Sequence, residues 1–334
     1  MPLLGASTLS LNNSDMTTRS LHLLLISAAA TFFVACSTDD EQEPSSARYP
    51  LTIEVQENPL VNSDANARAT RAAITSTSSL TTFTLDYQYG AAPNTGSMKA
   101  TKGSNGQWTS GTWPYSAAEN DQEVSWYAHT DGTFHAGADP YVSFSVEEYA
   151  SSQKDLLVAK ATSTYSETSG KLSFTFDHAT TALRFYVKKA TNLADYTLSI
   201  TSVRLCNIIN KGQYDYATSS WTPSNSRSYY TLYEGSAKTL GTADYEALDA
   251  SDAPYLFMIP QTLTAWDGTT DIASATTQGY IQIACTISKD ANNVYSGTAY
   301  IPFGATLSAG MQHDVKINIG KNSLYSDANT KIIQ

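Results

Sequence analysis

The sequence predicts an all-β protein made of antiparallel β-sandwiches, and three observations support this. Charged residues make up only 15% of the chain, whereas aromatic residues reach 11% and tyrosine alone occurs 21 times. Aromatic and β-branched side chains suit the half-buried surface of a pleated sheet. Short segments with alternating apolar and polar residues recur along the chain between clusters of Gly, Asn, Asp and Ser. No segment of helical length carries apolar residues three and four positions apart.

The predicted strands are the segments in which every second residue is apolar. One apolar face per strand is typical of antiparallel sheets that pack face to face. Residues 146–160 could hold one helical turn and no more. In chain order the predicted strands are residues 51–55, 83–87, 124–128, 142–146, 172–176, 183–187, 196–200, 280–284, 298–302 and 315–319.

These strands are too many for one ordinary sandwich, so we expect two domains. The boundary is placed in residues 162–170, which are rich in Ser and Thr and end in a glycine, as linkers and turns do. This gives an N-terminal sandwich over residues 49–168 and a C-terminal sandwich over residues 169–334.

The beginning of the chain predicts export. Arg19 precedes an apolar run over residues 21–34, and Ala35 and Cys36 close it. This order is that of a secretory signal peptide, and the run is too short for a spanning helix. Met16 is the expected start, and residues 1–35 are the expected signal. The cysteine after a small residue resembles the lipobox of bacterial lipoproteins, which implies that Cys36 carries the lipid, palmitate included, and anchors the chain at the outer membrane.

Residues 36–48 predict an acidic tether, because Asp39, Asp40, Glu41 and Glu43 occur there without any apolar run. The segment is either a flexible spacer or an export tag similar to that of Bacteroidetes surface lipoproteins. The whole chain has a formal charge of −11, and removal of residues 1–35 deletes one charge of each sign. This charge argues against nucleic acid as a partner, since nucleic-acid binding needs cations to meet phosphates.

No catalytic, cofactor or metal motif stands out, so we predict no enzyme, no cofactor and no metal. His129 and His135 are interpreted as ordinary loop histidines, because zinc needs more ligands at suitable spacing. Cys206 and Cys285 lie in apolar, strand-like runs and either form a disulfide or are small buried hydrophobes. The tryptophans either fill the sandwich cores or form a platform for sugars. They are Trp108, Trp113, Trp126, Trp221 and Trp266.

Several motifs in a fixed order resemble the fimbrillin family, the pilin subunits of Bacteroidetes type V pili and their fimbrillin-like relatives. Each motif is short, and it is the ordered set over residues 20–320 that carries the resemblance. After the lipobox the motifs are residues 51–55, the arginine segment Ala-Arg-Ala-Thr-Arg-Ala-Ala at 67–73, Trp113-Pro114, Val-Ser-Trp-Tyr-Ala at 124–128, residues 155–159, residues 172–179 with Leu183-Arg-Phe185, Ile259-Pro-Gln261 and Ala309-Gly310 before the last strand.

The resemblance implies two transthyretin-like β-sandwich domains and assembly by donor-strand exchange. An arginine-specific protease would cut after Arg71 or Arg68, and the strand with Leu51, Ile53 and Val55 would leave. A strand of another pilin subunit would then fill the groove. The alternative for the arginines is a basic patch in a disordered linker.

The resemblance further implies a structural and adhesive subunit of a surface pilus, with a host or bacterial receptor or glycan as a further partner. Residues 321–334 are poor in apolar side chains. This departs from stalk pilins, which donate a long terminal strand, and is compatible with a tip or accessory subunit. The alternative is a monomeric surface lipoprotein that binds glycans.

Overall fold

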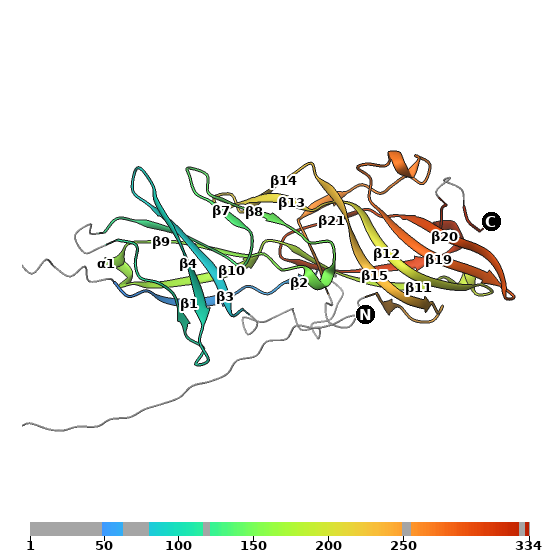
Figure 1. The fold of residues 1–334 in the computed structure, drawn as a ribbon, viewed down its shortest axis with the longest axis horizontal. Coiled ribbons are helices and arrows are strands. Elements are labelled where there is room, and N and C mark those ends of the chain that lie inside the picture. The colour runs from blue at the N-terminus through green and yellow to red at the C-terminus, as the bar shows by residue number, and fades with distance from the viewer. Residues whose placement is uncertain (1–48, 63–79, 116–120, 249–254, 327–330, 334) are drawn as a thin grey trace, which may run out of the picture. The chain divides into compact units, whose positions relative to one another are not determined.

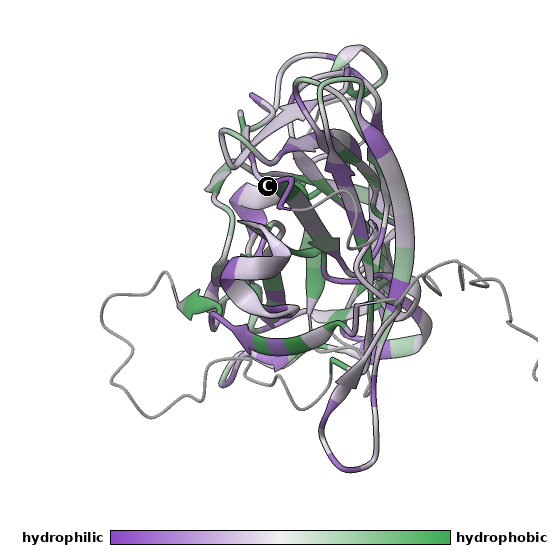
Figure 2. Cartoon of the chain, turned by 90° about the vertical axis from the view of Figure 1, so that its left-hand side faces the viewer, coloured by the Kyte–Doolittle hydropathy of each residue, from purple (hydrophilic) through white to green (hydrophobic). Residues whose placement is uncertain are grey.

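The computed structural model describes residues 49–62, 80–115, 121–248, 255–326 and 331–333. All of them belong to one compact unit that spans residues 46–334. Within these ranges the chain is almost entirely β-structure, so the all-β prediction is confirmed. Polar and apolar residues alternate along many of the strands, as Figure 2 shows.

Seven strands surround the first hydrophobic core and close into a barrel in the order β1-β10-β9-β6-β3-β4-β5 (Figure 1). The ring closes through one antiparallel contact, between Ile53 and Trp108. The strands are β1 (Thr52–Glu57), β3 (Thr82–Tyr89), β4 (Asn94–Lys102), β5 (Trp108–Thr109), β6 (Val124–His129), β9 (Leu157–Ser163) and β10 (Lys171–His178).

Three further groups of strands surround the second core. One sheet has the order β16-β11-β22-β2, with β17 beside β11; a four-stranded sheet has the order β15-β12-β19-β20; and β18 pairs with β21. The strands are β2 (Val61–Asn62), β11 (Thr181–Lys189), β12 (Thr197–Ile209), β15 (Arg227–Thr239), β16 (Glu246–Ala247), β17 (Leu256–Met258), β18 (Gln261–Leu263), β19 (Tyr280–Lys289), β20 (Asn292–Pro302), β21 (Ala305–Leu307) and β22 (Met311–Ile319).

A fourth sheet combines early and late parts of the chain. Its order is β14-β13-β8-β7, and β8 (Tyr141–Ser145) pairs antiparallel with β13 (Lys211–Asp215) over five residues. The outer strands are β7 (Thr133–His135) and β14 (Ser220–Pro223).

Helical structure in the described residues is limited to single turns. The α-helix α1 (Tyr165–Thr168) has a capping box, in which Thr164 and Glu167 each accept a hydrogen bond from the backbone N–H of the other. Short 3-10 helices are Ala150–Ser152, Thr191–Leu193, Ile272–Ser274 and Lys321–Ser323.

The prediction of purely antiparallel sheets is wrong. Strand β1 runs parallel to β10, and β22 runs parallel to both β11 and β2. Alternation in a sequence tells which face of a strand is buried, but not the direction of its neighbour. In these three pairs the partners are far apart in the sequence, so the chain has room to return in the same direction.

The boundary between residues 168 and 169 does not separate the two cores. Strand β10 follows it, yet β10 pairs with β1 and β9 and places Leu172, Phe174 and Phe176 in the first core. Strand β8 precedes it, yet Val142 and Phe144 lie in the second core. Residues 162–170 are therefore a tight connection within the barrel, formed by α1, and their polar composition reflects a turn and not a linker.

Candidate functional site: the first strand and its groove

Strand β1 is seated between β10 and β5. Six of its residues pair in parallel register with Lys171–Phe176 of β10, and Ile53 pairs with Trp108 of β5. Before the strand, the Tyr49 carbonyl accepts a hydrogen bond from the Trp113 N–H at 3.0 Å. The Thr52 N–H donates to the Gly170 carbonyl at 2.8 Å. We call the space that β1 fills between β10 and β5 the β1 groove.

One face of β1 is turned to the barrel core. Leu51 and Ile53 are buried with 9% and 4% of their surface exposed, and Val55 is half-buried and packs against the same core. On the opposite face Glu54 forms an exposed ion pair with Lys171 at 2.7 Å. The three residues predicted for the displaced strand, Leu51, Ile53 and Val55, thus face the core as their alternation indicates. That the strand is displaced stays a prediction.

Aromatic rings close the groove where the chain enters β1. The rings of Tyr49 and Tyr165 lie 3.9 Å apart, and Trp113 lies 5.4 Å from Tyr165. Gly170 makes this contact possible, because its φ is +78° and a Cβ there would lie 2.2 Å from the Pro50 carbonyl oxygen. A residue without a side chain lets the α1–β10 turn and the N-terminal segment meet backbone to backbone.

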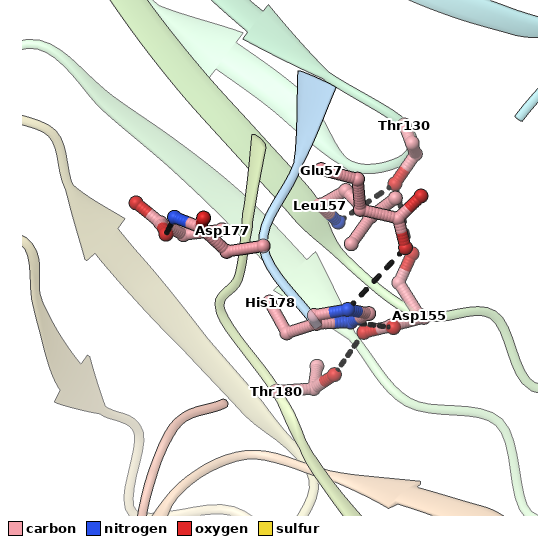
Figure 3. A network of polar contacts seen from close by, with 8 residues as sticks. Glu57, Thr130, Asp155, Leu157, Asp177, His178 and Thr180 are labelled. Atoms are coloured by element: carbon pink, nitrogen blue, oxygen red, sulfur yellow. Dashed lines mark hydrogen bonds and ion pairs between the residues drawn. The ribbon is translucent and has the colours of Figure 1, made fainter. Parts of the chain in front are cut away.

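Polar side chains close the other end of the groove, as Figure 3 shows. Glu57, the last residue of β1, places its Oε1 at 3.4 Å from Nε2 of His178 in β10. The other ring nitrogen of His178, Nδ1, pairs with the Asp155 carboxylate, and Thr180 donates a hydrogen bond to the same carboxylate. The backbone on both sides is held as well, since Thr130 donates to the Asp155 carbonyl at 2.8 Å and the Asn58 N–H donates to the Phe176 carbonyl at 2.8 Å.

These groups are buried and electrostatically coupled. The side chains of Glu57, His178 and Asp155 expose 8%, 3% and 17% of their surface. Burial raises the pKa of Glu57, although the charge of His178 lowers it in part. Burial opposes protonation of His178, but the hydrogen bond to Asp155 and the charges of Asp155 and Glu57 outweigh it and raise the pKa. The cluster therefore favours a protonated His178 between two acids.

Sequence analysis missed this polar cluster, although a signal was present. Glu57 continues the inward series of Ile53 and Val55, and His178 continues that of Phe174 and Phe176. A strict period of two places both polar side chains on the buried face. That they lie beside each other follows from the parallel pairing of β1 and β10, which the sequence does not reveal.

The other predicted maturation residues lie outside the described residues. These are Cys36, Arg68 and Arg71, together with the signal and tether over residues 1–48. The arginine segment lies between β2, which ends at Asn62, and β3, which begins at Thr82.

The two cysteines are free and buried small residues, and this decides between the two alternatives left open by the sequence. Cys206 pairs across the sheet with Tyr280, and Cys285 pairs with Ile200, so the two thiols are several residues apart along neighbouring strands. Burial raises the pKa of Cys206 to about 12 and that of Cys285 to about 11.

The interpretation of His129 and His135 as loop residues is wrong, because they are the last residues of β6 and β7. His129 contacts the Asp86 carboxylate at 2.7 Å through Nε2, and His135 contacts the Ser143 hydroxyl at 3.0 Å. In the part of the chain that the structure describes, no group of three or more His, Cys, Asp or Glu side chains could hold a metal ion. Trp113, Trp126 and Trp266 are buried, so the five tryptophans do not form one exposed platform.

A hollow of about 720 Å³ lies over the sheet that contains β7, β8, β13 and β14, and Phe144 and Pro223 form apolar parts of its lining. Hydroxyl, amide and charged side chains line it. They include Asp131, Thr133, Ser143, Lys211, Gln213 and Thr222.

The last described residues pack on the second core. Leu324 and Ile333 are buried, and Tyr325 exchanges two backbone hydrogen bonds with Tyr300. The ring of Tyr325 lies 5.4 Å from that of Trp266. This segment is thus held by its own subunit. Among the described helices, none is long and apolar enough to cross a membrane.

Fold and site together define an all-β protein whose candidate site is a strand-filled groove. A fimbrillin-like family model matches residues 61–332, which is most of the chain, and the protein therefore belongs to the fimbrillin-like family. No curated protein matches the sequence.

Several solved structures are similar to this chain at low sequence identity, and the first of them shares the fold. A fimbrial protein from Bacteroides vulgatus is 17% identical, with a TM-score of 0.50, over 80% of this chain and 95% of that chain. A protein proposed to act in cell adhesion, from Bacteroides ovatus, is 14% identical, with a TM-score of 0.43, over 83% of this chain and 95% of that chain. A similar one from Bacteroides eggerthii is 13% identical, with a TM-score of 0.45, over 82% and 87%.

Proposed function

We propose that this protein is a structural and adhesive subunit of a surface pilus, and not an enzyme. The observation that carries the proposal is the seating of β1, the first strand that the structure describes, which completes a barrel and precedes the arginine segment. Burial of apolar side chains such as Leu51 and Ile53 is worth roughly 1.5–3 kcal/mol each. A groove that gains this much from one strand would bind a similar strand from a neighbouring subunit.

The proposed maturation has two steps. The precursor is exported and carries a lipid on Cys36, which places it at the outer membrane. An arginine-specific protease then cuts after Arg71 or Arg68 and frees the segment that contains β1. The backbone groups of β10 that β1 now satisfies would become available to a donor strand.

We also propose that the two cores correspond to two transthyretin-like sandwich domains. In this proposal the two domains are not separated at a single point such as residue 168. Strand β10 belongs with the first core, although it follows that residue, and β8 belongs with the second, although it precedes it. The chain passes between the two cores more than once, and the last passage lies between β10 and β11.

A position at the pilus tip or in an accessory role fits the last described residues. A donor strand must be free to extend, whereas Leu324 and Ile333 are buried in their own subunit. This subunit would accept a strand more readily than it donates one.

The test compares a protein that begins at Ser37 with one that begins at Ala72. The shorter form lacks β1 and should oligomerise or bind a donor-strand peptide, while the longer form stays monomeric. Size-exclusion chromatography with light scattering measures this. Identical monomers with the same melting temperature would contradict donor-strand assembly.

Anchoring is tested separately. Cys36→Ala should abolish labelling with palmitate and release the protein from membranes. N-terminal sequencing of the mature surface form should begin at Ala72 for a cut after Arg71, or at Ala69 for a cut after Arg68. Persistent labelling of the variant would refute the lipid assignment.

A second candidate is a monomeric surface lipoprotein that binds glycans, because hydroxyl and amide side chains, which can bind sugars, line part of the hollow over β8 and β13. A carbohydrate array with the Ser37 form distinguishes the two functions. Binding that is lost on Lys211→Ala together with Gln213→Ala, without any oligomer formation by the Ala72 form, would favour this candidate.

A further inference from the structure

The inward face of β1 is apolar along most of the strand and becomes acidic at its last residue, Glu57. Ile53 and Val55 face the core together with Leu172 and Phe174 of β10, but Glu57 follows on the same face, opposite Phe176. An acid on a buried face is unfavourable unless a partner compensates its charge. The groove therefore holds two kinds of site, apolar ones along most of its length and one polar site at its end.

The partner of Glu57 is built into the rest of the barrel. His178 extends from β10, Asp155 holds its ring through Nδ1, and Thr180 holds the Asp155 carboxylate (Figure 3). Nε2 of His178 forms an ion pair with Glu57 at 3.4 Å, and the backbone of Asn58, the next residue, also favours the protonated ring. Since Nδ1 is engaged by Asp155, Nε2 is the atom left to meet whatever side chain the strand presents.

Removal of β1 would leave this imidazole facing an open groove. Asp155, Thr180 and Thr130 belong to other parts of the chain and would stay, so the ring would keep its orientation. An incoming strand with an apolar side chain at this place would leave the buried Nε2 donor of His178 without a side-chain acceptor, although Nδ1 stays paired with Asp155. A carboxylate would restore the contact that Glu57 makes.

We propose that the β1 groove selects an incoming strand with an acidic residue at the position of Glu57, two residues beyond the last apolar anchor. The inference rests on the proposed strand exchange and adds a rule for its partner. The occupant is a strand of another pilin subunit that runs parallel to β10, with apolar residues at the positions of Leu51, Ile53 and Val55 and Asp or Glu at the fourth inward position.

The experiment uses the full chain with a recognition sequence for a site-specific protease in place of residues 67–71. After cutting, β1 is held only by its non-covalent contacts, and a fluorescent peptide with the sequence of residues 49–62 can replace it. Three peptides are compared by fluorescence anisotropy at pH 6: the native sequence, one with Glu57→Gln and one with Glu54→Gln. Glu54 is the matched control, because its ion pair with Lys171 is exposed.

The native and Glu54→Gln peptides should bind with affinities within about threefold of each other, since exposed ion pairs contribute little. The Glu57→Gln peptide should bind roughly tenfold more weakly or worse, as expected for a buried bond to a charged group. Against the same protein with His178→Gln, this preference for glutamate should vanish.

Equal binding of the Glu57→Gln and native peptides overturns the selection rule and leaves strand exchange intact. A preference for glutamate that survives His178→Gln also overturns it, because the acid would then be recognised by another group. Failure of all three peptides to enter the cut protein overturns strand exchange itself, and the rule with it.

Discussion

At the residue scale, the buried cluster of Glu57, His178 and Asp155 makes stability depend on pH. The pKa of His178 is raised in the folded protein, so its contribution is fully present below its ordinary value and is lost as the pH rises through the raised value. The pKa of Glu57 is raised as well, which has the same sign, because the folded state then favours the protonated acid. Among the described residues, the charged groups that face His178 are Asp155 and Glu57.

We therefore expect the free energy of unfolding to fall between pH 6 and pH 9 by an amount that His178→Gln removes. Urea unfolding at a series of pH values measures the slope of the free energy of unfolding against pH for the wild type and for the His178→Gln protein. His135→Gln is the control, because the contacts found for His135 are with the Ser143 hydroxyl and the Tyr141 ring and not with an acid of the cluster. A wild-type slope in the His178→Gln protein would exclude the cluster as its origin.

The cysteines give a second expectation for single residues. With pKa values of about 12 and about 11, Cys206 and Cys285 are thiols at neutral pH and are shielded from reagents. Maleimide should leave both unlabelled in the native protein and label both in denaturant without reductant, as peptide mass spectrometry can show. A disulfide-linked peptide pair would contradict the strand register.

At the scale of elements, the turn before β10 should control how firmly β1 is held. Gly170→Ala places a Cβ against the Pro50 carbonyl at a residue with positive φ. Gly106→Ala is the control, because Gly106 also has a positive φ but no atom lies within 4 Å of the added Cβ. The control should cost about 1–2 kcal/mol, the usual penalty for a left-handed residue with a side chain. The Gly170 variant should cost at least about 1 kcal/mol more. Thermal unfolding of both variants, with hydrogen exchange of β1, measures the difference, and equal losses would contradict a tight contact.

The terminal segment offers another comparison between elements. Leu324→Ala should destabilise the protein by about 2–5 kcal/mol, because it opens a cavity in the second core. Val294→Ala, at a position with 47% of its surface exposed, should change stability by less than about 0.5 kcal/mol. Chemical denaturation tests both. A small effect at Leu324 would mean that the segment is free to extend and could act as a donor strand.

Sequence reasoning identified elements better than it identified their neighbours. The strand at residues 51–55 and its inward residues follow from local alternation, and β1 is found there. The parallel pairing with β10, more than a hundred residues later, depends on packing that no local pattern encodes. For the same reason, the contact of Glu57 with His178 could not be predicted from the sequence, although each residue continues the alternation of its own strand. The glycine at 170 looked like a linker signal, but its role is to allow a close backbone contact.

At the scale of the whole described unit, the two cores should unfold together. Strand β8 pairs with β13, and the Tyr216 hydroxyl donates to the Ala128 carbonyl at 3.1 Å, so residues of early and late segments share one structure. Calorimetry should show one transition. Tyr216→Phe should lower stability by about 1 kcal/mol without splitting it. Two transitions in either protein would mean that the cores are energetically independent.

The sheet shared by β8 and β13 also has a mechanical consequence. The barrel and the second core are connected by several crossings that the proposed cut leaves in place, because the β7–β8 hairpin follows β6, β9 follows β8, and β11 follows β10. A tensile load applied to the two halves is therefore divided among parallel covalent paths and the hydrogen-bonded register between Tyr141–Ser145 and Lys211–Asp215. Because the load is divided in this way, extension of one connecting segment does not separate the two halves. Domains that are joined by a single flexible segment lack this protection. A protein built in this way would resist separation of its two halves under load.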